Sequence, residues 1–205
     1  MPEDNYVSRK KDLTRSFERA IRWVSAPLVD RYGKTFCDAV VAEARREHEA
    51  LIAKIPFIGG SRNRWTSDLT ESAQILALFR ALRGQGKPAA EIAEIIYDGM
   101  RVRLAGYPRP LLRLFGWLQF TKPFLAGLRR QAQTSRQRTY PGDFVAEVVA
   151  GDGREFDWGI DFTECAIQKF YAARAPLSSC PICARWITSR VIHGWEDTPW
   201  DRRRD

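Results

Sequence analysis

Apolar residues recur every three to four positions through the first part of the chain, which is the spacing of one face of an α-helix. This pattern predicts a helix over residues 12–32, with Pro27 and Gly33 interrupting it, and a longer amphipathic helix over residues 34–55. Charges of both signs alternate along the other face of the second helix, as on a solvated helix face. Both segments therefore predict scaffold rather than a site of chemistry.

Two further helices are predicted after a loop that contains a Gly-Gly pair. The first has Asp68 or Thr70 as its N-cap and ends at Gly84. The second carries Pro88 in its first turn, where the missing N–H costs nothing, and continues to Met100. The chain contains no P-loop, GxSxG or GxGxxG motif, so these helices offer no known phosphate-binding or nucleophile signature.

The hydrophobic period changes from helical to alternating after residue 143. Residues 144–149 are apolar and rich in β-branched side chains, as in a strand. Residues 151–153 are Gly-Asp-Gly, which tolerate the positive φ of a tight reversal. Residues 154–162 then alternate apolar and acidic side chains, which predicts a second strand and hence a β-hairpin.

The alternation stops at Thr163, where a helix is predicted to begin, because nothing interrupts a helix before Pro176. Thr163 is expected as the N-cap, with Glu164 in the first turn, where the helix dipole favours a negative charge. Four side chains that can carry chemistry are then expected to converge where the strand meets the helix: Asp157, Asp161, Glu164 and Cys165.

Together these elements predict a mainly helical α+β fold in one domain over residues 1–205. A helical scaffold over 12–138 precedes a hairpin–helix motif over 144–175 and an atypical tail over 178–205. No apolar run is long enough to span a bilayer, and the first thirty residues are polar and charged, so a cytoplasmic protein is expected. The four cysteines show no disulfide spacing and are expected as reduced thiols.

Charge is most uneven between residues 99 and 142, which hold nine basic residues and no acidic one, interleaved with aromatic and aliphatic side chains. A basic amphipathic helix of this kind can bind an anionic membrane surface or an acidic partner without any catalysis. It can also be a core helix whose arginines reach solvent along their aliphatic stems, or a cluster that holds a substrate carboxylate. We take the core helix as the simplest interpretation, because the apolar stripe is broad and Pro123 would kink a helix lying on a surface.

Nucleic acid is not an expected partner, because no zinc-finger spacing, helix-turn-helix pattern or aromatic strand platform accompanies the charge. Cys180 and Cys183 form a CxxC, but a zinc site needs a second pair of ligands, and only Cys165 and His193 are near in sequence. No metal or other cofactor is therefore expected, although a small thiol–metal domain remains an alternative. Cys37 is expected to be a buried small hydrophobe, and His48 to lie at the surface or in the packing rather than to bind a metal. On spacing alone, Cys165 fits a buried core cysteine as well as a nucleophile.

The run EVVAGDGREFDWGIDFTECAIQKFY resembles the L-2-amino-thiazoline-4-carboxylic acid hydrolase family, most specifically in Thr163-Glu164-Cys165 following Asp161. The resemblance implies hydrolytic ring opening of a cyclic amidine to N-carbamoyl-L-cysteine, with no cofactor and a small carboxylate as substrate. It implies Glu164 or Asp161, beside Asp157, as acid or base and Cys165 as nucleophile or positioning thiol. Basic residues such as Arg129 or Arg130 would anchor the substrate carboxylate.

The tail departs from the pattern of that family. Cys183 takes the place of a family cysteine, as a candidate additional thiol, but the Leu-Asp-Tyr segment and the terminal cysteine motif that follow in the family are missing. If residues 185–188, Arg-Trp-Ile-Thr, are encoded CGC-TGG-ATT-AC, a displaced frame gives Leu-Asp-Tyr. The coding DNA tests the hypothesis that the tail is out of frame. An out-of-frame tail implies that the activity is impaired or absent.

Overall fold

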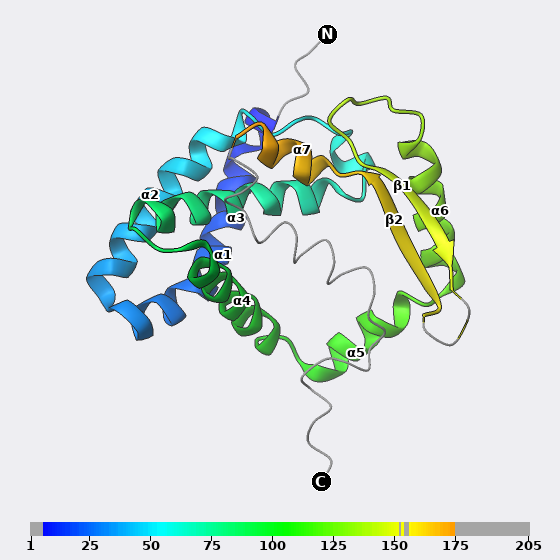
Figure 1. Cartoon of the computed structure of the whole chain (residues 1–205). Helices are drawn as coiled ribbons and strands as arrows, with labels where there is room; N and C mark the ends of the chain where they lie inside the picture. Colours follow the sequence, from blue (N-terminus) through cyan, green and yellow to red (C-terminus); the bar gives the residue numbers. More distant parts are fainter. Residues whose placement is uncertain (1–5, 152, 154–155, 175–205) are drawn as a thin grey trace.

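The computed structural model of the chain describes residues 6–151, 153 and 156–174. Within these residues helices predominate, and a single antiparallel hairpin is followed by a short helix, so the fold is α+β and mainly α, as the sequence predicts (Figure 1). None of the helices in the described ranges combines the length and apolar character needed to cross a membrane.

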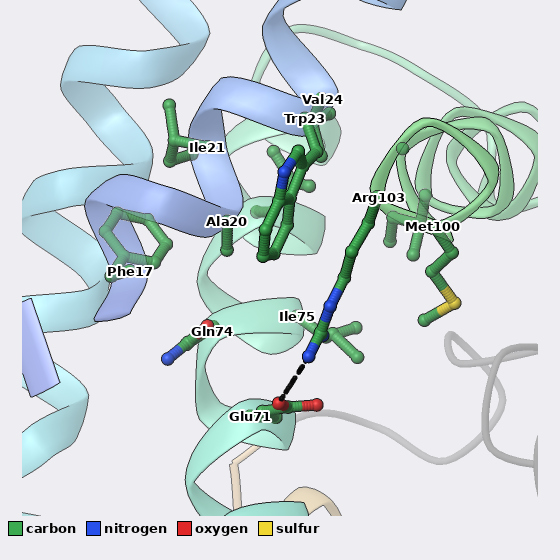
Figure 2. A pocket seen from close by; sticks show the side chains of 13 residues that line it. Phe17, Ala20, Ile21, Trp23, Val24, Glu71, Gln74, Ile75, Met100 and Arg103 are labelled. Atoms are coloured by element: carbon green, nitrogen blue, oxygen red, sulfur yellow. Dashed lines mark hydrogen bonds and ion pairs between the residues drawn. The ribbon is translucent and has the colours of Figure 1, made fainter. Parts of the chain in front are cut away.

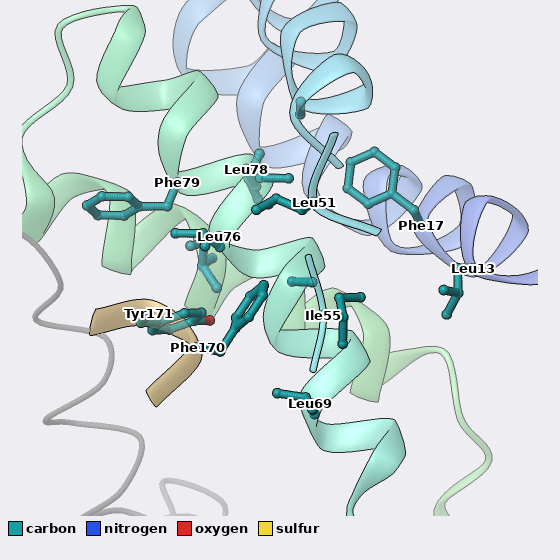
Figure 3. Close-up of a cluster of buried hydrophobic side chains, with 14 of the residues drawn as sticks. Leu13, Phe17, Leu51, Ile55, Leu69, Leu76, Leu78, Phe79, Phe170 and Tyr171 are labelled. Carbon is teal, nitrogen blue, oxygen red and sulfur yellow. The ribbon is translucent and has the colours of Figure 1, made fainter. Parts of the chain in front are cut away.

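Four helices form the scaffold. They are α1 (Lys10–Tyr32), α2 (Lys34–Ile52), α3 (Thr66–Gly84) and α4 (Ala89–Ala105). Helix α2 packs on both α1 and α3, and α4 packs on α1. The apolar stripes that predicted these helices supply the buried core between them (Figure 3).

Pro27 was predicted to interrupt the first helix, but it lies inside α1. A proline in a helix leaves the carbonyl four residues earlier without its usual donor, and the exposed outer turns of a helix let water satisfy such a group. The chain turns instead at Gly33, whose φ of 81° lies in the region that favours glycine.

Helix α3 begins at Thr66, before both predicted N-caps, so Asp68 and Thr70 lie inside it. The start is fixed by Asn63, whose side-chain oxygen accepts a hydrogen bond of 3.0 Å from the backbone N–H of Trp65. Pro88 likewise precedes α4 rather than occupying its first turn. Both predicted helix starts differ from the observed ones by a few residues, and for α3 the loop residue Asn63 rather than a helix residue supplies the hydrogen-bond partner.

The basic segment 99–142 is not one helix. It contains the end of α4, then α5 (Arg109–Leu118) and α6 (Lys122–Ser135), with Pro123 in the first turn of α6 instead of at a kink. Helix α6 packs on the hairpin and buries Leu128 and Ala132, whereas α5 has no buried residue. The core-helix interpretation therefore holds for part of α6 and is wrong for α5.

The hairpin pairs β1 (Val145–Ala150) with β2 (Trp158–Glu164). One face packs inward, where the rings of Trp65, Phe144 and Phe162 lie 5.4–5.5 Å apart. The pairing is regular up to Phe162 opposite Ala146 and then shifts by one residue, which places Thr163 in a bulge.

Helix α7 (Ala166–Ala172) starts later than predicted. Thr163 and Glu164 belong to β2, and Cys165 is the N-cap residue. Thr163 cannot cap the helix because its hydroxyl donates to the carbonyl of Val145 across the strands, at 3.3 Å. Helix α7 is fixed to the scaffold by Tyr171, whose hydroxyl donates to the Ser72 carbonyl at 2.8 Å (Figure 3).

Candidate functional site

The candidate site lies where β2 passes into α7 (Figure 1). The last strand residue is Glu164, and the next residue, Cys165, begins the helix with an extended backbone (φ −113°, ψ 116°). Both side chains are partly buried. Because the two residues are consecutive and the backbone is extended, the carboxylate and the thiol are neighbours in the chain at the end of the sheet, but their side chains leave it on opposite sides.

Two cations hold the Glu164 carboxylate. Arg138 Nη2 and Lys169 Nζ each lie 2.5 Å from one of its oxygens. The hydrogen bond from Lys169, together with the charges of Lys169 and Arg138, lowers the pKa of Glu164. Glu164 is therefore ionised at neutral pH, where it can accept a proton but has none to donate.

Lys169 is held by more than the ion pair. Its ammonium also donates to the carbonyls of Pro141 and Asp143, each at 3.1 Å. The three acceptors come from the loop before β1 and from the end of β2. Lys169 thus joins α7 to both chain segments at the open end of the hairpin and fixes the position of Glu164.

Arg138 reaches Glu164 from a turn with unusual backbone geometry. It is the one non-glycine residue with positive φ (52°) in the described chain. Such a conformation typically costs a side-chain-bearing residue about 1–3 kcal/mol and is found disproportionately at functional sites. Its ion pair with Glu164 offsets part of that cost.

Cys165 packs against the edge of the hydrophobic core with its side chain half-buried. It makes no hydrogen bond that caps α7. The Cys165 side chain therefore contacts the core and also keeps part of its surface exposed, so the thiol fits both roles that the sequence left open.

Asp157 and Asp161 do not join this pair. Both are exposed, and Asp161 lies opposite Glu147 in the hairpin. At roughly 3.3 Å per residue of strand, Asp161 is about 13 Å and Asp157 about 26 Å along the chain from Cys165. Of the four residues expected to converge, Glu164 and Cys165 are neighbours in the chain at the junction, and these two aspartates lie along the hairpin.

The predicted substrate anchors, Arg129 and Arg130, are exposed on α6, and no contact joins them to the junction. The cations at the junction are Arg138 and Lys169, which the sequence analysis missed. Lys169 had a signal, because it follows Cys165 by four residues and so lies one helical turn away. Arg138 had none, since only the folded loop brings it to Glu164. The candidate thiol Cys183, with Cys180, lies outside the described residues.

A buried polar cluster lies next to the junction. The Asp143 carboxylate accepts hydrogen bonds from the Asn63 amide at 2.9 and 3.0 Å and from the Phe144 backbone N–H at 2.7 Å. Burial raises the pKa of Asp143. The Asn63 side chain also accepts from Gln131 on α6. These bonds satisfy the carboxylate and join the loop before α3 to α6 and β1, so we assign them a structural role.

A cavity of about 70 Å³ lies between α1, α3 and α4 (Figure 2). Its walls are mostly apolar, and an ion pair between Glu71 and Arg103 at 3.4 Å lies on one side. Arg103 also lies over the ring of Trp23, 4.8 Å from its centroid. Ligand pockets commonly measure about 300–1,000 Å³, so this space is too small for a substrate of that kind.

No set of three or more metal-binding side chains occurs among residues 6–151, 153 and 156–174. Comparisons of the chain with models of protein families, with curated proteins and with solved structures found no match.

Proposed function

We propose that the chain is a hydrolase that opens a small cyclic amidine bearing a carboxylate, as its resemblance to the L-2-amino-thiazoline-4-carboxylic acid hydrolase family implies. The observation that carries the proposal is the junction of β2 and α7, where two cations hold Glu164 ionised at the residue that precedes Cys165. Catalysis of such a reaction needs a base or nucleophile, a proton donor and a cation for the substrate carboxylate. Residues of each kind lie within this one junction.

In the proposed reaction, water adds to the ring carbon between sulfur and nitrogen. Glu164 accepts the proton of the attacking water, either directly or through Cys165. The carbon–sulfur bond then breaks, and the departing sulfur takes a proton, so that N-carbamoyl-L-cysteine forms with one water consumed. Lys169 is the nearest donor for that proton, and the unused N–H groups of Arg138 can bind the substrate carboxylate.

A nucleophilic role for Cys165 is the alternative within the same proposal. The thiolate then attacks the ring carbon, and water later releases the carbamoyl product from the enzyme. The two roles predict different activities for Cys165→Ser. A hydroxyl preserves some positioning but is a far weaker nucleophile at neutral pH, so the variant should keep more activity if Cys165 only positions the substrate than if its thiolate attacks.

The test is thiol release from L-2-amino-thiazoline-4-carboxylate by the full chain. Cys165→Ala and Glu164→Gln are each expected to lower the rate by about 10²-fold or more. Asp157→Asn is the matched control, because that carboxylate is exposed and remote from the junction, and it is expected to leave the rate unchanged. Wild-type rates in both Cys165→Ala and Glu164→Gln would refute the site.

A further inference from the structure

Helix α5 and its flanks expose an unusually large group of apolar side chains. We call this group the α5 surface. Trp117 is 65% exposed and Phe115 is 52% exposed. Its other members are Leu111, Leu114, Leu118 and Phe120. Scattered exposed apolar residues are ordinary, but a contiguous group on one helix marks a binding surface.

The helix is sharply amphipathic. At 100° per residue, Leu111, Leu114 and Leu118 lie on one stripe, and Arg109 and Arg113, four residues apart, lie on the other. Figure 1 shows α5 leading away from the end of α4 toward α6 and the hairpin, apart from α1–α3. The apolar stripe therefore has no scaffold helix to pack against within the described residues.

The charge of the molecule is concentrated around this helix. Residues 99–142 contribute +9 to a formal net charge of +8, so all other residues together sum to −1. Among the described residues, acidic partners hold Arg103, Arg136 and Arg138. No acidic partner is seen for the remaining six: Arg101, Arg109, Arg113, Lys122, Arg129 and Arg130. A partner that covers the α5 surface must therefore accept apolar side chains and carry negative charge.

We propose that the α5 surface docks on an anionic lipid membrane. A ten-residue helix is about 15 Å long, too short to span a bilayer but suited to lie in its interface. There the leucines and Phe115 enter the acyl boundary, Trp117 lies at the headgroups, and the arginines face lipid phosphates. The proposal is independent of the hydrolase activity, because Glu164 and Cys165 lie outside α5.

Charge argues against the two other occupants. Residues 175–205 carry five arginines and four acidic residues, so this segment has a net charge of +1 and does not neutralise a cationic face. A second copy related by a twofold axis would place the same cationic patch against itself. Of the three occupants compared, anionic lipid is the one that supplies both the negative charge and the apolar phase.

The test is co-sedimentation of the full chain with vesicles of phosphatidylcholine containing about one-third phosphatidylserine, compared with vesicles of phosphatidylcholine alone. We expect binding to the anionic vesicles that falls at least about fivefold as salt rises from about 0.1 to about 1 M, because the screening length shrinks about threefold. Tryptophan emission is expected to shift to shorter wavelength on binding, and Trp117→Phe to remove most of that shift.

Two paired variants locate the surface. Leu114→Ser with Phe115→Ser removes apolar side chains, and Arg109→Gln with Arg113→Gln removes charge; each pair is expected to lower binding at least about fivefold. All four residues are exposed, so the fold is expected to survive. The matched control is Arg19→Gln with Arg22→Gln on α1, which removes two exposed charges elsewhere and is expected to leave more than about half of the binding.

Four results would overturn the proposal. The first is folded protein that fails to bind anionic vesicles at low salt, and the second is a loss of binding in the α1 control equal to that in the α5 variants. The third is a dimer, seen by sedimentation velocity, that dissociates in the Leu114→Ser, Phe115→Ser variant. That result would assign the α5 surface to a second copy of the chain. The fourth is absence of vesicle binding together with faster tryptic cleavage of residues 175–205 in the Leu114→Ser, Phe115→Ser variant. That result would assign the α5 surface to the tail.

Discussion

At the scale of single residues, His48 is a titratable group that is buried on the apolar face of helix α2. The imidazole is 2% exposed, stacks on Phe17 with centroids 4.3 Å apart, and leaves Nε2 without a hydrogen-bond partner. Burial lowers its pKa to about 4, although Glu18 acts in the opposite direction. Of the surface and packing positions that the sequence left open for His48, the structure shows packing, and the imidazole is neutral in the folded state near neutral pH.

This depressed pKa predicts acid sensitivity. The unfolded chain binds the proton below about pH 6.5 and the folded chain only near pH 4, so the free energy of unfolding falls with pH across that window. Between pH 7 and pH 5 His48 is expected to remove about 2 kcal/mol, at about 1.4 kcal/mol per pH unit below 6.5. Urea unfolding at the two pH values measures this loss.

His48→Gln is the control for the acid effect. It keeps a side chain of similar size but removes the titration, so the variant is expected to lose less stability than the wild type between the same pH values. The carboxylates with lowered pKa, such as Glu18 and Glu164, stabilise the fold above their ordinary pKa of 4.5 and lose that contribution mainly as the pH falls below it, so they change stability little between pH 7 and pH 5. An equal fall in both proteins would show that His48 is not the group responsible.

At the scale of elements, the packing of α4 on α1 depends on Gly99. A Cβ atom built there would lie 2.7 Å from Cγ2 of Val24, closer than carbon atoms approach. Glycine inside a helix costs about 1 kcal/mol relative to alanine, so its presence here is a cost offset by the close approach of two helices.

Gly99→Ala is therefore expected to destabilise the protein, by about 1–2 kcal/mol, because overpacking outweighs the gain in helix propensity. Adding Val24→Ala should recover part of this loss, since it removes the clashing methyl groups, and the double variant should be less destabilised than the sum of the single ones. Gly84→Ala is the matched control: nothing lies within 4 Å of its Cβ position, so no loss is expected. Strict additivity in denaturant unfolding would contradict the proposed clash.

The elements that the sequence predicts correctly are those whose own side chains carry the information. The stripes of α1 to α4 and the alternation of β2 are local, so the fold class and most element boundaries follow from them. Thr163 was misplaced because its hydroxyl finds a partner eighteen residues earlier, across the hairpin. The exposure of α5 escaped prediction for a similar reason: a stripe shows that a helix is amphipathic, not which surface covers it.

The candidate site likewise contains residues that the local sequence predicts and residues that only the folded chain brings in. That Glu164 and Cys165 are neighbours follows from the sequence because the residues are consecutive. Arg138 enters through a turn in the left-handed region that no local pattern indicates. Asp157 lies just before β2, and the extended backbone of that strand separates it from the thiol, whereas a helix would have brought the two closer.

At the scale of the whole molecule, the described fold ends on an anchored residue. The Arg174 side chain donates to the carbonyl of Lys54 at 2.6 Å, and its own carbonyl accepts from Arg80 at 2.6 Å. The resemblance to the hydrolase family is closest up to this region, and the departure in the tail begins a few residues later. Replacing residues 178–205 therefore leaves the anchor and the proposed site in place.

The last prediction follows from that boundary. A chain whose residues 178–205 are replaced by a family-like tail, with Leu-Asp-Tyr and the terminal cysteine motif, is expected to release thiol at least about tenfold faster than the natural chain. The reason is that the family's missing motifs would complete the site beside Glu164 and Cys165. The same tail on Cys165→Ala is the control and is expected to give no gain. If the replaced chain stays folded and gains nothing on L-2-amino-thiazoline-4-carboxylate, the tail is not what limits activity, and the substrate must be sought among other small carboxylates.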